Sequence, residues 1–172
     1  IIVTSLWPDD PAPEGTTRVG PLAQEGDPEE AVEPYDVLLN PGSHGDHFGE
    51  LRERLEAKGY DVRTVGDDDW ETKPTMTPYT AAADVVVCTG FSSIADTVVA
   101  GTPCVIYPFL PFQKALAERA EAKHLTGISM ATTVDRVIDR VEEYVGSDVA
   151  PDYDNGAPAF VDTVLAGLDD PT

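Results

Sequence analysis

Two glycine-containing loops each follow a short apolar run, and their residue types are suited to binding an anion. The first loop, residues 42–45, places Ser43 and His44 between two glycines, so that the backbone can approach a ligand while the side chains donate hydrogen bonds. The second loop starts at Gly90 and opens into a helical pattern at Ser92, where free amides and the positive end of the helix dipole favour a phosphate. For both loops the alternative is ordinary turn chemistry.

A carboxylate lies close to the second loop. Asp96 follows Ser92 by four residues, about one helical turn, and could accept hydrogen bonds from a ribose diol. Its alternative role is to compensate the dipole at a helix start. His44 and His47, with Asp46 between them, could suggest a metal pair, but they lack a third well-spaced ligand. The sequence therefore predicts no metal site.

Alternating strands and helices position these loops. The apolar patterns predict strands over residues 36–40, 61–65, 84–88, 103–107 and, more weakly, 127–130. Helical spacing predicts helices over residues 46–58, 77–82, 92–100, 112–123, 133–144 and 158–168. The run at 84–88 is typical of a strand buried on both faces. This order predicts an α/β fold, a Rossmann-like parallel sheet with helices on both faces, which binds ligands at the carboxyl ends of its strands.

Residues 79–113 carry a recognisable pattern, YTAAADVVVCTGFSSIADTVVAGTPCVIYPFLPFQ. It resembles the C-terminal, donor-binding domain of the GT-B glycosyltransferases, especially the family of the bacterial MurG enzyme and the UDP-glycosyltransferases. The shared elements are an Ala-Asp pair before the strand, the glycine turn, a helix with an acid, a Gly-x-Pro segment and a final Gln. With residues 1–22 and the loop at 42–45 included, the resemblance extends over most of the chain.

The resemblance implies a role for each matching position. It implies a diphosphate site at Gly42, Ser43, His44, Gly90, Ser92 and Ser93, a ribose contact at Asp96, a base contact at Lys73 and Met76, and a donor-sugar contact at Gln113. The family's catalytic base lies mainly on its N-terminal domain, so no catalytic residue is expected in this chain. No cofactor is implied either.

Several positions depart from the family pattern. The family acid is usually Glu where this chain has Asp96, and plant-type relatives have an Asp where this chain has Phe112. MurG-like enzymes have an Asn where this chain has Leu116. Retaining relatives place a second acid where this chain has Cys88, which favours the inverting mechanism. The donor sugar and the acceptor are left open.

The resemblance also divides the chain. Residues 1–22 are expected to be the end of an N-terminal domain or a crossover strand, residues 23–34 a linker, and residues 35–150 the nucleotide-sugar-binding domain. Residues 151–172 are expected to form a C-terminal tail with a helix, which in this family often crosses back to the N-terminal domain. The expected partners are the nucleotide-sugar donor and a missing N-terminal domain or partner subunit.

The charge balance excludes some functions. With 32 acidic and 11 basic residues, the chain carries a net charge of -21, which repels nucleic acid and anionic lipid at ordinary ionic strength. Acidity spread along the chain points to a proteome bathed in molar salt; the alternative is an ordinary acidic protein. Cys88 and Cys104 each lie in an apolar run, as buried free thiols or, alternatively, a disulfide. Trp7 and Trp70 lie in polar loops, as buried anchors or as stacking platforms.

These observations favour the donor-binding half of an inverting glycosyltransferase that uses a UDP-linked sugar and is inactive alone. Three alternatives stay open: a stand-alone donor-binding subunit that docks on a membrane partner, a fragment of a nucleotide-sugar epimerase, and a regulatory nucleotide-binding domain. We expect no signal peptide, and the printed sequence has no apolar run of the roughly 20 residues that a membrane span needs. A cytoplasmic location is expected, with any peripheral membrane acceptor reached through the rest of the protein.

Overall fold

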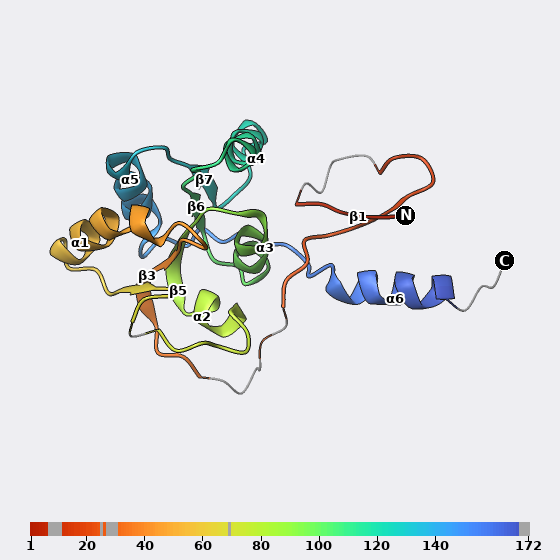
Figure 1. Cartoon of the computed structure of the whole chain (residues 1–172), viewed down its shortest axis with the longest axis horizontal. Coiled ribbons are helices and arrows are strands. Elements are labelled where there is room, and N and C mark those ends of the chain that lie inside the picture. Colours follow the sequence, from red (N-terminus) through yellow and green to blue (C-terminus); the bar gives the residue numbers. More distant parts are fainter. Residues whose placement is uncertain (7–11, 25, 27–30, 69, 169–172) are drawn as a thin grey trace.

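A five-stranded parallel sheet forms the centre of the protein (Figure 1). The computed structural model describes residues 1–6, 12–24, 26, 31–68 and 70–168, so Trp7 lies outside the described residues. In spatial order, the strands are β4 (Val62–Thr64), β3 (Tyr35–Asn40), β5 (Ala83–Cys88), β6 (Cys104–Ile106) and β7 (Ile128–Met130). All four neighbouring pairs are parallel, which confirms the predicted fold class.

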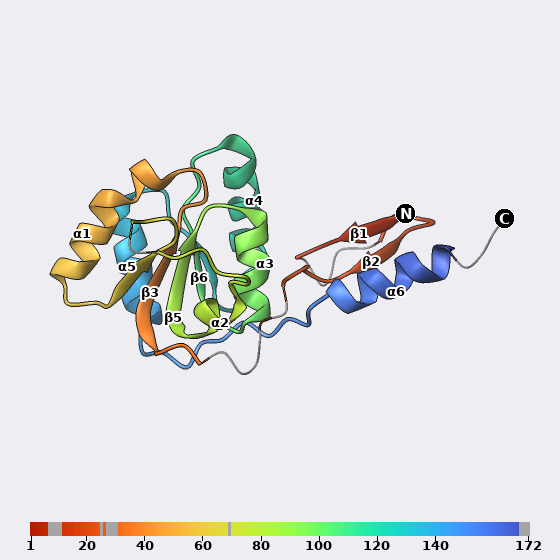
Figure 2. The same cartoon turned by 60° about the horizontal axis from the view of Figure 1, so that its bottom comes forward.

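Helices cover both faces of this sheet (Figure 2). One face carries α1 (Gly49–Ala57) and α5 (Val134–Tyr144), and the other carries α2 (Thr77–Ala81), α3 (Phe91–Val99) and α4 (Pro111–Ala122). Because side chains alternate along a strand, Val37 and Leu39 pack under α1 and α5, while Leu38 packs under α3 and α4. The core is therefore two apolar layers with the sheet between them.

The predicted helix at 46–58 is two elements. A 3₁₀ turn, η1 (Gly45–His47), is followed by α1, and Phe48 lies at the junction. The Phe48 N–H bonds to the Gly45 carbonyl at 2.9 Å, whereas the Arg52 N–H bonds to the Phe48 carbonyl at 2.9 Å. The Phe48 ring, 1% exposed, anchors this change in the core. The bounds of the other predicted helices and strands of the sheet agree with the structure to within one or two residues.

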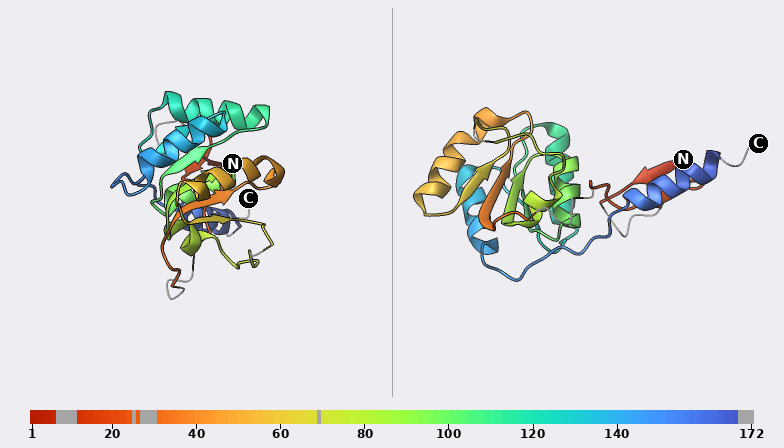
Figure 3. Two further views of the ribbon diagram at one scale, coloured as in Figure 1. Left: turned by 90° about the vertical axis from the view of Figure 1, so that its left-hand side faces the viewer. Right: turned by 90° about the horizontal axis from the view of Figure 1, so that it is seen from below.

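A small unit lies apart from the sheet (Figures 1 and 3). It consists of a parallel pair, β1 (Ile2–Thr4) and β2 (Thr17–Val19), with α6 (Ala157–Leu168) beside β2. We call β1, β2 and α6 the satellite unit. No residue of α6 is buried, and several of its apolar side chains are exposed: Val161, Val164, Leu165 and Leu168. Within the described ranges, none of the helices combines the length and apolar character that crossing a membrane requires.

Two chain segments, one following β2 and one preceding α6, are held together between the satellite unit and the sheet. The Gly156 N–H donates to the Pro21 carbonyl at 2.8 Å. The Asn155 side chain accepts from the Ala23 N–H at 3.2 Å and donates to the Ala23 carbonyl at 2.9 Å. A Cβ on Gly156 would lie 2.6 Å from the Gly20 carbonyl oxygen, so the approach requires glycine.

Candidate functional site

The two loops that the sequence singled out lie side by side at the carboxyl ends of β3 and β5. Asn40 and Cys88, the last residues of these strands, are paired in register. The Thr89 hydroxyl donates to the Pro41 carbonyl at 3.4 Å, which ties the second loop to the start of the first. Gly42 has φ +57, a left-handed conformation that favours glycine, and an added Cβ would meet the Thr89 hydroxyl at 3.6 Å. The two loops therefore form one edge, which we call the loop edge.

Helix α3 opens onto the loop edge without a side-chain cap. Gly90 is its N-cap, with extended backbone at φ -135 and ψ 168, and no side chain accepts a hydrogen bond there. The Ile94 N–H bonds to the Gly90 carbonyl at 3.1 Å and closes the first turn. The N–H groups of Phe91, Ser92 and Ser93 precede that bond and have no partner within the helix. Neither loop contains Lys or Arg, so an anion here would be held by backbone amides, hydroxyls and His44.

Asp96 lies on α3 below these amides and contacts the predicted linker. Its Oδ1 accepts a hydrogen bond from the Gln24 N–H at 3.3 Å. Burial raises the pKa of this half-buried carboxyl, and the Gln24 hydrogen bond opposes that rise. The Gln24 carbonyl in turn accepts a hydrogen bond from the Thr77 hydroxyl at the start of α2. Gln24 therefore joins the proposed ribose residue to the neighbourhood of Met76, a contact that sequence reasoning missed.

The two residues that the resemblance implies as contacts of the nucleobase lie in different surroundings. Met76 directly precedes α2 and is partly buried against the core cluster that includes Ile94 of α3. Lys73 instead lies over aromatic rings, with its Nζ 5.0 Å from the centre of the Tyr79 ring and 6.0 Å from that of Trp70. Trp70 packs edge-on against Tyr79 at 5.6 Å between ring centres. Trp70 is therefore a partly buried anchor. The rings of Trp70 and Tyr79 hold Lys73 in place.

Gln113 lies in the first turn of α4, which follows β6 at the same end of the sheet. The side chain is 5% exposed, and its Oε1 accepts hydrogen bonds from the N–H groups of Phe109 and Leu110, both at 2.9 Å. Gln113 therefore fixes the β6–α4 loop through its Oε1. The sequence signal for this cap was a Gln at the third position of the helix that begins at Pro111.

Aromatic rings connect the first loop to the β6–α4 loop. The Phe109 ring lies 5.4 Å from the ring of His44 and stacks on the ring of His47 at 4.7 Å. Phe109 also contacts Tyr107, with 4.6 Å between ring centres. Phe112 is separate, with 65% of its surface exposed. Sequence reasoning missed the histidine partners of Phe109.

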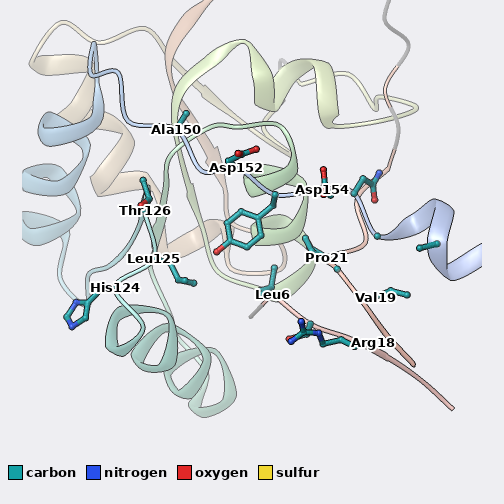
Figure 4. A pocket seen from close by; sticks show the side chains of 16 residues that line it. Leu6, Arg18, Val19, Pro21, His124, Leu125, Thr126, Ala150, Asp152 and Asp154 are labelled. Carbon is teal, nitrogen blue, oxygen red and sulfur yellow. The ribbon is translucent and has the colours of Figure 1, made fainter. Parts of the chain in front are cut away.

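A cavity of about 750 Å³ lies away from the loop edge, between the satellite unit and the turn before β7 (Figure 4). Its walls include Leu6, Leu125 and Tyr153, with Asp152 and Arg18 among the polar groups. None of the site residues implied by the sequence lines it. Because its sheet-side wall is the chain entering β7, the cavity is at the opposite end of the sheet from the loop edge.

Comparisons with known proteins found likeness in structure but not in sequence. No known family model matches the chain, and a search of curated proteins found no match. One solved structure that is similar is a crystal structure described as that of the glycotransferase of kitacinnamycin. It superimposes with a TM-score of 0.60 at 22% identity, over 83% of this chain and 44% of that chain.

This chain therefore spans less than half the length of the protein it resembles in structure. At that identity the likeness concerns the fold. It agrees with the five-stranded parallel sheet and the helices on both of its faces. The chain has an α/β fold like that of a glycosyltransferase.

Proposed function

We propose that this chain is the donor-binding half of an inverting glycosyltransferase that uses a UDP-linked sugar. One observation carries the proposal: α3 begins without a side-chain cap at the carboxyl end of β5, directly beside the loop at 42–45. Amides at such a helix start bind phosphate groups in parallel-sheet proteins. The structural likeness to a glycosyltransferase supports this choice among nucleotide-binding functions.

The chemistry assigned to the loop edge is stabilisation of the leaving group. In inverting transfer, an acceptor hydroxyl attacks the anomeric carbon while the bond from that carbon to the diphosphate breaks. Negative charge then grows on the diphosphate, where the amides of Phe91, Ser92 and Ser93 would stabilise it. His44, held beside Phe109, can add a hydrogen bond. A general base must deprotonate the acceptor, and we assign it to the second half of the complete enzyme.

The nucleoside would lie between Asp96 and Met76, and the Gln24 peptide now spans that region. Asp96 can accept hydrogen bonds from ribose hydroxyls through its second oxygen, or through Oδ1 once the Gln24 N–H is displaced. Gln113 would meet the sugar through Nε2. The exposed apolar side chains of α6 supply a surface for the second half of the enzyme. We place the protein in the cytoplasm, with any membrane contact made by that second half.

A pair of variants tests the role of the α3 amides. Phe91→Pro removes one N–H, and it suits the first helical position because Gly90 before it is extended. Phe91→Ala keeps the N–H and removes only the partly exposed ring. Calorimetric titration in about 2 M KCl, where charge repulsion is screened, measures the affinity of both variants for UDP. A hydrogen bond to a charged group contributes about 1.5–3 kcal/mol, so Phe91→Pro should weaken binding at least tenfold.

The matched variant Phe91→Ala should bind UDP about as tightly as the original protein. Equal affinities for Phe91→Pro and Phe91→Ala would exclude this amide from the site. Titration with GDP separates a uridine preference from general diphosphate binding, and Asp96→Ala tests the ribose contact in the same assay.

A further inference from the structure

Two thiols lie in contact in the core behind the loop edge. Cys88 ends β5 and Cys104 begins β6, and their Sγ atoms are 3.4 Å apart. In the β5–β6 ladder Cys88 is paired with Ile106 and Cys104 with Val86. The two cysteines are therefore offset by two residues and project from the same face of the sheet, under α3 and α4. Both side chains are fully buried.

This arrangement suits a covalent bond between the strands. A disulfide joins sulfur atoms about 2 Å apart, so the two Sγ atoms must approach by roughly 1.4 Å from their present contact. The sulfur atoms already lie against each other in one cluster, so the bond does not require the helices to move apart.

We propose that Cys88 and Cys104 form a modification site that closes to a disulfide when the protein reacts with hydrogen peroxide. The Cys88 sulfur loses its proton as it attacks one peroxide oxygen, the O–O bond breaks, and the hydroxide that leaves takes up that proton to form water. Cys104 sulfur then attacks the Cys88 sulfenic acid, the S–O bond breaks, and a second water forms. Two thiols and one peroxide thus give one disulfide and two waters.

The order of the two cysteines follows from their positions. Cys88 ends its strand two residues before the N-cap of α3, so it is the nearer of the two cysteines to the loop edge along the chain, and we assign the first attack to it. Because both side chains are buried, the oxidant must enter through a local opening of that edge. The hydrogen bond with Cys88, together with burial, raises the pKa of Cys104 well above its usual value, which keeps Cys104 a thiol until Cys88 has reacted.

The disulfide would act on the loop edge, since Cys88 is two residues before the N-cap of α3. Pulling Cys88 toward Cys104 shifts the backbone that presents the amides of Phe91, Ser92 and Ser93. This consequence rests on the proposed function, whereas the modification itself does not. We expect the dissociation constant of UDP to change severalfold on oxidation and to recover on reduction.

Peptide mapping of the folded wild-type protein tests the modification without any variant. After exposure to peroxide, quenching and alkylation of the unfolded chain, we expect a cross-linked peptide pair containing both cysteines and a mass lower by two hydrogens. Dithiothreitol should restore both alkylatable thiols. Recovery of two free thiols, or oxygen addition to Cys88 without the cross-link, would overturn the proposal. So would a cross-link that forms only when peroxide is added in unfolding concentrations of urea.

Cys88→Ala is the control for the effect on binding. It lacks the sulfur that reacts first with peroxide and cannot form the bond, so peroxide should leave its UDP affinity unchanged while the wild-type affinity shifts. An equal shift of UDP affinity in both proteins would show that the shift does not depend on the disulfide, and would overturn the link between the disulfide and the loop edge. If the reduced wild-type protein fails to bind UDP, the proposed function is contradicted. The peptide mapping would then still test, on its own, whether the disulfide forms.

Discussion

Replacing Gln113 by alanine should destabilise the protein through the β6–α4 loop. The side-chain Oε1 accepts two backbone hydrogen bonds of 2.9 Å from a position that is 5% exposed. At about 1 kcal/mol for each bond, the loss is about 2 kcal/mol of unfolding free energy. With a urea dependence of roughly 1–3 kcal/mol per molar, the unfolding midpoint should fall by about 1 M.

Two further variants separate the hydrogen bonds from side-chain volume. Gln113→Met keeps most of the volume and removes the acceptor, so it should lose most of the same free energy. Lys114→Ala changes the next residue, whose side chain is 60% exposed, and should leave the midpoint nearly unchanged. Urea unfolding followed by circular dichroism measures all three proteins. A midpoint for Gln113→Met equal to that of the wild type would refute the role assigned to Gln113.

Three other predictions follow from single features of the structure. Burial raises the pKa of Asp96, so the folded protein holds this proton more tightly than the unfolded chain, and stability falls as pH rises through the folded pKa. Asp96→Asn should therefore be more stable than the wild type near pH 7, with a difference that shrinks toward about pH 4; urea midpoints that differ equally at both values would contradict this. Gly156→Ala would place a Cβ 2.6 Å from the Gly20 carbonyl oxygen and should lower the unfolding free energy by about 1–3 kcal/mol. Gly167→Ala lies in open space on α6 and should raise the unfolding free energy by roughly 0.5–1 kcal/mol. Thermal unfolding compares the two variants with the wild type. Because the chain carries a net charge of -21, UDP affinity should rise between about 0.2 and 2 M KCl as repulsion is screened, and calorimetry showing a steady fall would indicate a basic site instead.

The parts of the fold that local patterns determine could be predicted. The Val85–Cys88 run has no polar residue, so its burial on both faces followed from composition. The start of α3 followed from Gly90, and Thr133 caps α5 through its hydroxyl, which accepts from the Arg136 N–H at 3.3 Å. The break at Phe48 was missed because helical spacing alone does not distinguish a 3₁₀ turn from the first turn of an α-helix.

Contacts between distant segments could not be predicted. Gln24 and Asp96 are 72 residues apart, and Ala23 and Asn155 are 132 apart; no local pattern specifies either pair. The stacking of His47 on Phe109 depends in the same way on two loops that meet only in the folded sheet. For the candidate site, the sequence indicated the loops and the helix start, whereas the linker contact on Asp96 required the structure. The cap made by Gln113 had a local sequence signal that was missed.

The central claim is that the first amides of α3 bind the diphosphate of the donor. Nuclear magnetic resonance of the ¹⁵N-labelled protein tests it most directly, with UDP and uridine added in separate titrations. We predict that UDP shifts the amide signals of Phe91, Ser92 and Ser93, and that uridine, which lacks phosphate, leaves them nearly unchanged. Saturating UDP that moves other signals but not these three would contradict the account.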